Sequence, residues 1–447
     1  MEPMGYLPRE TLGKPKVFHM PCALCRAGQP TSTESHRFCA EKGQTEAPKL
    51  PLCRYGTKAV SAPVRKLGKG VVDSVVFSER DIDLLRILRW CRCIFREDAV
   101  RYFSEDIVSN LTALSYLKLY QESGALILTA GGNRFLESVF SDLPSGIPLA
   151  YREPDTRRRL RLSKLVLTTY RAGLNIFTTT TEELIPAPAL FLPAIMRGRG
   201  RNPWGNTRTA AIVHLEGLSC AVHFVCPGIG KLMLMDELNA FANNTGALKD
   251  VRQSIVFAGS SYPEILSELE QLDNSGESRL ITYGEAYRQM TMPVHLLSCD
   301  DTGAKQLRIM NVPDYRKKFS MAALKAHYEP PPKNAPAWDA LYGDIPFVMA
   351  ADMNLRRVDA AITTAQERGY SQIALAALEE QAEAVFFTRY RDAGLARVFT
   401  LTDAALSELD CDAVSLHSPS RRQFLTAKGD VVDAPLIQTH RKTGRKG

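Results

Sequence analysis

Helical periodicity begins abruptly at Ser78, and it constrains the fold of the following residues more than any other pattern in the chain. Ser78 precedes Glu79, Arg80 and Asp81, which gives a serine cap with carboxylates in the first turn, where the helix dipole favours negative charge. Apolar residues then recur at every third position, at Ile82, Leu85, Leu88 and Cys91. The pattern predicts a helix that buries one face.

Shorter elements follow this helix in a characteristic order. We expect a second helix over Arg96–Phe103 and a third over Asp106–Ser123, which ends at Gly124, a residue type common just past helix ends. After Gly124 we expect a strand, a glycine turn and a closing helix, over residues 125–129, 130–133 and 134–140. This is the layout of a winged helix-turn-helix, whose third helix enters the DNA major groove. We therefore expect this segment to bind double-stranded DNA.

Polar side chains on the outer face of the predicted third helix are candidates for base contacts. Asparagine can pair with adenine through two hydrogen bonds, and a lysine can meet a backbone phosphate. We expect these contacts from Ser109, Asn110, Thr112, Ala113, Ser115, Tyr116 and Lys118, with Arg134 of the closing helix beside them. The alternative for each residue is an ordinary solvated helix face.

Basic residues are concentrated in four segments of the chain. Residues 1–70 hold 12 Lys and Arg against 5 Asp and Glu, and residues 152–171 hold 7 against 2. Residues 197–208 and 421–447 are basic too, so the remainder is acidic although the net charge is +7. Such segregation suits a protein that meets polyanions through selected surfaces. The candidate phosphate contacts are Arg157, Arg158, Arg159, Arg161, Arg197, Arg199 and Arg201, unless they form a solvated charge run.

Length and composition are those of a multidomain globular protein, with 447 residues, 45% hydrophobic and 23% charged. No run approaches the roughly 18 apolar residues of a membrane span, and the first residues lack the pattern of a secretory signal. Ten cysteines in such a chain predict free thiols in a reducing compartment. We expect a cytoplasmic protein without a membrane partner.

Strand and helix patterns beyond residue 207 predict two α/β regions separated by Glu329-Pro330-Pro331-Pro332-Lys333. The first region has predicted strands over 210–215, 221–225, 231–235, 254–258 and 295–297, a helix over 262–272 and a turn over 300–303. The second has strands over 345–350, 372–376 and 398–401 and helices over 355–368 and 379–393. Alternating strands and helices favour parallel pairing. No internal repeat is visible in the sequence.

The predicted fold class is α+β or α/β and multidomain, with an N-terminal winged helix-turn-helix, a mixed α/β domain and a smaller C-terminal α/β segment. The predicted parts are a basic, largely disordered arm (1–74), the winged helix-turn-helix (75–142), a linker with an Arg-rich helix (143–206), the mixed α/β domain (207–328), the small α/β segment (340–420) and a basic tail (421–447).

The N-terminal arm carries cysteines at spacings that a zinc site can use. Cys22 and Cys25 form a Cys-x2-Cys pair, and Cys39 with Cys53 or His36 could complete a tetrahedral set. A structural zinc is therefore the one cofactor that the sequence suggests. The alternative is that these residues are reduced thiols in a disordered arm.

Two stretches of the chain resemble the replication-relaxation family of plasmids and integrative conjugative elements of Gram-positive bacteria. They are residues 78–85 (Ser-Glu-Arg-Asp-Ile-Asp-Leu-Leu) and residues 128–136 (Leu-Thr-Ala-Gly-Gly-Asn-Arg-Phe-Leu). The basic segment from Arg157 to Gly173 is similar to the Arg-rich helix that follows the winged helix in that family. The resemblance implies a DNA-binding role in replication, DNA relaxation or transcription control of a mobile element, with other replication or conjugation proteins of that element as partners.

Two functions of other classes stay open. A metal-dependent nuclease or nickase would place carboxylates and a lysine at strand ends of the middle region, where Glu216, Asp236, Glu237, Asp300, Asp301 and Lys305 fall. No predicted strand carries the Asp…(Asp/Glu)-x-Lys order that such a site needs, so we assign no catalytic residue. The third function is a scaffold that docks other proteins.

Overall fold

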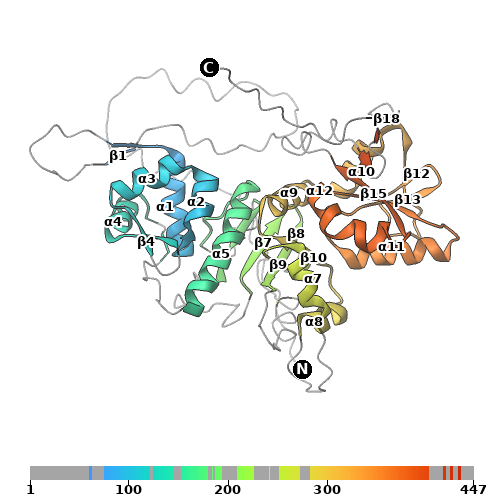
Figure 1. The fold of residues 1–447 in the computed structure, drawn as a ribbon, viewed down its shortest axis with the longest axis horizontal. Helices are drawn as coiled ribbons and strands as arrows, with labels where there is room; N and C mark the ends of the chain where they lie inside the picture. Colours follow the sequence, from blue (N-terminus) through green and yellow to red (C-terminus); the bar gives the residue numbers. More distant parts are fainter. Residues whose placement is uncertain are drawn as a thin grey trace, which may run out of the picture. The chain divides into compact units, whose positions relative to one another are not determined.

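The computed structural model describes most of the chain between residues 60 and 433. The described residues are 60–62, 75–120, 124–141, 143–144, 153–179, 184, 187–193, 209–225, 241, 251–271, 282–401, 416–418, 423–425 and 431–433. The chain divides into two compact units, Met1–Lys58 and Ala59–Gly447, and the first lies outside the described residues. The second unit combines helices with mixed sheets, which confirms the expected mixture of α and β structure (Figure 1).

The first three helices of the described residues lie between Glu79 and Ala113. Helix α1 (Glu79–Cys91) begins at the predicted cap: the Ser78 hydroxyl accepts from the Asp81 backbone N–H, and the Asp81 carboxylate accepts from the Ser78 N–H at 2.7 Å. Helix α2 (Arg96–Phe103) matches its predicted bounds. Helix α3 (Glu105–Ala113) follows after the single residue Ser104.

A three-stranded antiparallel sheet lies beside these helices, and it corrects two of our expectations. Its strand order is β3 (Ile94–Phe95), β5 (Ala125–Leu128) and β4 (Leu117–Tyr120). A separate two-stranded sheet of β1 (Val60–Ala62) and β2 (Val75–Phe77) comes earlier in the chain. The predicted helix over Asp106–Ser123 is confirmed as far as Ala113 and wrong beyond it, because α3 ends there, Ser115 has a φ of +59° and β4 pairs with β5 as a hairpin. The predicted turn over 130–133 is the start of helix α4 (Ala130–Val139), capped by Thr129.

Helix α5 (Glu153–Arg171) confirms the Arg-rich helix that we expected after the linker, and one of its faces is buried. Leu160, Leu165 and Leu167 are buried, and a fully buried leucine contributes roughly 1.5–3 kcal/mol relative to an exposed one. One continuous cluster of buried side chains joins α5 to leucines of α1 and to valines of the next sheet. The N-terminal helices and that sheet therefore share a core.

The middle sheet has the order β10-β9-β8-β7-β6. Its strands are β6 (Ala189–Phe191), β7 (Ala211–Leu215), β8 (Leu218–Phe224), β9 (Arg252–Gly259) and β10 (Val294–Ser298). Its helices are α7 (Tyr262–Glu270), α8 (Tyr283–Gln289) and α9 (Asp301–Met310). The predicted turn over 300–303 is wrong, because the Asp300 carboxylate accepts from the Gly303 N–H at 3.0 Å and caps α9. The predicted strand over 231–235 lies outside the described residues.

The C-terminal sheet has the order β11 to β18. Helix α10 (Tyr315–Leu324) and a 3-10 turn, η4 (Lys325–His327), precede it. The elements are β11 (Tyr328–Glu329), β12 (Ala340–Tyr342), β13 (Ile345–Met349), α11 (Leu355–Glu367), β14 (Ile373–Ala377), α12 (Glu379–Gln381) with its π-helical continuation η5 (Ala382–Arg391), β15 (Ala396–Leu401), β16 (Leu416–Ser418), β17 (Gln423–Leu425) and β18 (Val431–Asp433). Strands β13, β14 and β15 are parallel, as the alternating pattern predicted.

The middle sheet and the first five strands of the C-terminal sheet repeat one topology that the sequence does not reveal. In each, a helix precedes five adjacent strands, the second strand runs antiparallel to its neighbours, and the last three are parallel. The second and third strands are joined by two residues in both, Glu216-Gly217 and Gly343-Asp344. Each turn has its glycine at positive φ, +69° and +57°, a conformation that glycine adopts without strain.

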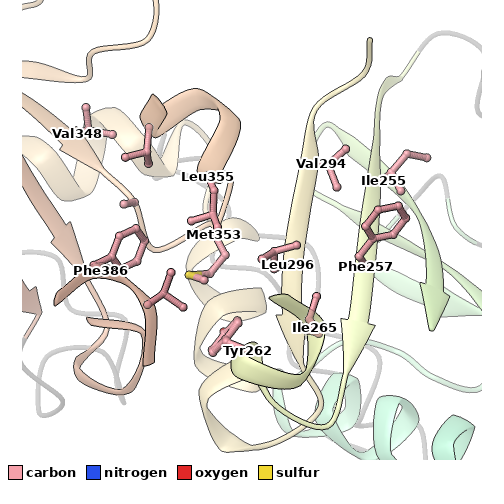
Figure 2. Close-up of a cluster of buried hydrophobic side chains, with 14 of the residues drawn as sticks. Ile255, Phe257, Tyr262, Ile265, Val294, Leu296, Val348, Met353, Leu355 and Phe386 are labelled. Atoms are coloured by element: carbon pink, nitrogen blue, oxygen red, sulfur yellow. The ribbon is translucent and has the colours of Figure 1, made fainter. Parts of the chain in front are cut away.

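Apolar side chains from both sheets form one buried cluster. Figure 2 shows Val294 and Leu296 of β10 facing Met353 and Leu355, which follow β13. Buried hydrogen bonds connect α7, α9 and α12 beside this core. The Tyr262 hydroxyl donates to Gln306 Oε1 at 2.7 Å and accepts from Gln381 Nε2 at 3.1 Å. Within the described ranges, no helix combines the length and the apolar character that crossing a membrane requires.

Candidate nucleic-acid interface

Helix α3 presents a polar face that is open to solvent. Ser104 precedes the helix and accepts from the Ile107 N–H at 3.4 Å, while Val108 and Leu111 are buried. The opposite face holds four of the residues we expected there, and all are exposed: Ser109, Asn110, Thr112 and Ala113. The exposed face is therefore small and polar, as a surface that approaches base edges needs to be.

Hydrogen bonds within α3 engage two of these side chains. The Ser109 hydroxyl donates to Glu105 Oε1 at 2.9 Å, and the Thr112 hydroxyl donates to the Val108 carbonyl at 2.7 Å. Each hydroxyl oxygen can still accept a hydrogen bond. The amide of the exposed Asn110 offers both a donor and an acceptor, so it has the best chemistry for recognising a base.

The start of α3 is acidic. Glu105 and Asp106 lie in its first turn, and the helix itself carries no Lys or Arg. Arg96 of α2 pairs with the Glu105 carboxylate, which offsets one of the two charges. Any attraction of this surface to phosphate must therefore come from neighbouring elements.

The hairpin of β4 and β5 supplies one such cation. Lys118 is exposed on β4, and its neighbour Leu119 is a large apolar side chain that is 46% exposed. Tyr116, which we placed on the outer face of a helix, lies at the base of the hairpin. Its ring stacks on Phe135 with centroids 5.3 Å apart and an interplanar angle of 19°, so it packs against the fold.

Helix α4 carries another exposed cation, Arg134. Arg89 of α1 holds this helix in place: its Nη2 lies 2.9 Å from Glu137 Oε1, and its Nε donates to the Pro144 carbonyl at 2.9 Å. The orientation of α4 is therefore fixed by a buried guanidinium, and Arg134 has a defined place on the surface.

The arginines of α5 point in different directions. Arg157 and Arg158 are exposed and pair with Glu153 and Asp155 of their own helix. Arg159 is only 7% exposed, so its place in our expected phosphate surface is not supported. Arg161 is half-buried, and Lys164 of the same helix, which we had not singled out, lies with its Nζ 5.4 Å from the Phe95 ring centroid. The spacing of three residues from Arg161 to Lys164 is the sequence signal that places both on one side of the helix.

Two of the strand-end residues weighed for a nuclease, Asp301 and Lys305, have structural partners. Asp301 pairs with Arg101 and Arg171, and Lys305 Nζ lies 3.0 Å from Glu380 Oε1. Glu216 is an exposed turn residue, while Asp236 and Glu237 lie outside the described residues. Strands β6 to β10, as far as the structure describes them, carry no Asp or Glu. This arrangement gives no support to a catalytic centre in the middle sheet.

The suggested zinc ligands Cys22, Cys25, Cys39 and Cys53, and the basic loop at residues 197–201, lie outside the described residues. Among the residues that are described, no three His, Cys, Asp or Glu side chains gather as a metal site would require. Cys93 is buried, and burial raises the pKa of its thiol to about 12, so it stays protonated at neutral pH.

Comparison with family models, with curated proteins and with solved structures finds no match to this chain.

Proposed function

We propose that residues 75–140 form a winged helix-turn-helix that binds double-stranded DNA. Helix α3 would enter the major groove, and the β4–β5 hairpin would be the wing. The observation that carries the proposal is the sharp step from α2 to α3 through Ser104, with the exposed polar face of α3 beside a hairpin. Helices and hairpins in this order dock on DNA in many regulators.

Two exposed cations on the same part of the chain support this proposal. Lys118 lies on β4, which packs against α3, and Arg134 lies on α4. Contacts to phosphates fix the register of a protein on the duplex, while Asn110 would read a base. The resemblance to the replication-relaxation family suggests the setting, which is replication, relaxation or transcription control of a mobile element.

Duplex binding across a series of salt concentrations tests the proposal. Fluorescence anisotropy with the full chain should give an affinity that falls linearly with salt on a double-logarithmic plot. Lys118→Gln should reduce that slope by about one, whereas Asn110→Ala should change the preferred sequence more than the general affinity. Lys317→Gln, an exposed lysine of α10, is the matched control. Equal slopes for the two lysine variants would contradict the proposal.

A second function, protein docking, is favoured by two features of the same surface. The first turn of α3 is acidic, and Leu119 exposes an apolar side chain on the hairpin. If the duplex titration shows no binding even at low salt, docking becomes the better explanation. A partner recovered by the wild-type chain and lost with Leu119→Ser would then identify the hairpin as the docking surface.

A further inference from the structure

A crevice opens at the carboxyl ends of the three parallel strands of the middle sheet. Its volume is about 280 Å³ when the open space at its mouth is counted, so it is an open crevice and not an enclosed cavity. Its lining residues come from the strand ends and from two helices: Phe224, Val225, Gly259, Ser260, Cys299, Arg161, Lys164 and Glu264. Crevices at this edge of α/β sheets are where such folds commonly bind ligands.

Two cations and one carboxylate line the crevice, so the lining itself favours an anion; Asp98 lies near Lys164 and Asp300 near Cys299, just outside the lining. Arg161 and Lys164 both come from α5, and Glu264 of α7 is the one carboxylate of the lining. Cys299 adds no negative charge, because burial raises the pKa of its thiol to about 12. Helix α7 begins at Tyr262 beside the crevice, and its N-terminal end carries a partial positive charge.

The corresponding edge of the C-terminal sheet holds an anion that belongs to the protein. There the carboxylate of Asp352, three residues beyond β13, accepts from Arg316 Nε at 3.0 Å and from Nη2 at 2.6 Å. Arg316 lies on α10, the helix that precedes the five strands, just as α5 precedes the strands of the middle sheet. Phe224 and Val225 of the crevice lie at the end of β8, the third strand of the middle sheet. The third strand of the C-terminal sheet is β13, and Asp352 follows its end.

We propose that the crevice of the middle sheet binds a phosphate group, held by Arg161 and Lys164. A guanidinium matches two phosphate oxygens at once, and an ammonium adds a point charge. Helix α5 would then bind an external anion, as α10 binds the carboxylate of Asp352 through Arg316. This site is separate from α3 and its hairpin and does not depend on the proposed DNA binding.

Titration with inorganic phosphate tests the site directly. The thermal midpoint of the full chain should rise when phosphate replaces chloride at constant ionic strength, because a ligand that binds the folded state stabilises it. Arg161→Gln and Lys164→Gln should each weaken phosphate affinity about tenfold or more, as expected for a lost charged hydrogen bond. Glu264→Gln should strengthen it, since it removes the opposing carboxylate.

Arg158→Gln is the matched control, because Arg158 lies on the same helix, loses the same charge and is paired with Asp155 away from the crevice. Phosphate affinity equal in Arg161→Gln and Arg158→Gln would overturn the proposal. Arg161→Lys, which keeps the charge, should retain part of the affinity, and circular dichroism in chloride verifies that each variant is folded.

Duplex DNA in the same assay identifies the source of the phosphate. If the group belongs to the DNA backbone, Arg161→Gln lowers duplex affinity and reduces its salt slope by about one. If it belongs to a free phosphate-bearing molecule, duplex affinity is unchanged while the response to inorganic phosphate is lost. A failure of Lys118→Gln to affect DNA binding bears on α3 and the hairpin alone, so the two proposals fail separately.

Discussion

Arg316 binds the carboxylate of Asp352 through two nitrogens, Nε at 3.0 Å and Nη2 at 2.6 Å from Oδ2. Asp352 is completely buried, and Arg357 Nη2 lies 3.7 Å from its other oxygen. Burial alone would raise the pKa of Asp352, but the two guanidinium groups hold the pKa well below its usual range. The Asp352 backbone carbonyl contacts His295 Nδ1 of β10 at 2.9 Å, so this residue joins the two sheets.

Asp352→Asn should destabilise the protein strongly. The substitution removes the negative charge that compensates Arg316 and Arg357, and breaking a buried ion pair typically costs about 3–5 kcal/mol. Thermal or urea unfolding measures the loss. Asp344→Asn, in the exposed β12–β13 turn, is the control and should change stability by less than about 0.5 kcal/mol. If Asp352→Asn loses no more stability than Asp344→Asn, the buried ion pairs of Asp352 contribute little to folding.

Stability should fall as the pH drops from about 6.5 to about 4, in part because of His223. This residue is buried on β8, and burial lowers its pKa from 6.5 to about 4. In that window the unfolded chain binds a proton that the folded chain excludes, so the stability present above pH 6.5 is lost on acidification. The shift corresponds to roughly 3 kcal/mol.

His223→Gln should flatten this pH dependence, measured as the unfolding midpoint at a series of pH values. Burial also lowers the pKa of His214 and His295, so part of the slope will remain. The exposed His327 is the control, and His327→Gln should leave the slope unchanged. A slope that is the same in His223→Gln and in the wild type would contradict the prediction.

Asp301→Asn should have a small effect that depends on salt. Asp301 Oδ2 lies 2.8 Å from Arg101 Nη2 of α2, and its other oxygen pairs with Arg171 of α5. These side chains are 36–57% exposed, so each pair contributes at most about 1 kcal/mol. The difference in unfolding free energy from wild type should shrink in about 1 M salt, where charges are screened. A large loss that persists in high salt would assign Asp301 a role beyond ion pairing.

Local signals predicted the longer helices and the parallel strands, and a long-range contact explains why the helix expected over 106–123 is wrong beyond Ala113. The cap at Ser78 and the alternation of strands and helices after residue 345 depend on neighbouring residues, so the sequence was sufficient there. Leu111, Leu114 and Leu117 continue a helical spacing, yet Leu117 leaves the helix to pair with Leu128, a partner that no local pattern reveals. The crevice was missed for the same reason, because its residues come from five elements.

For the candidate interface, the sequence predicted only which residues share the exposed face of a helix. Ser109, Asn110, Thr112 and Ala113 are exposed because Val108 and Leu111 define the buried side of α3. Arg159 was misplaced although a signal was present. Leu162 and Val166 follow Arg159 by three and seven residues, and both are buried on α5. This helical spacing predicts that residue 159 lies on the buried face in spite of its charge.

Two adjacent glycines of α4 should respond to alanine in opposite directions. A Cβ at Gly132 would lie 2.5 Å from the Tyr116 carbonyl oxygen, and that oxygen is held in place by the Thr129 N–H at 3.0 Å. The helix or the hairpin must shift, at a cost of about 1–3 kcal/mol. A Cβ at Gly131 meets nothing closer than 3.4 Å, so Gly131→Ala should stabilise the helix by about 0.5–1 kcal/mol. Thermal unfolding of the two variants compares them directly, and a Gly132→Ala protein as stable as Gly131→Ala would show that α4 and the base of the hairpin are not in close contact.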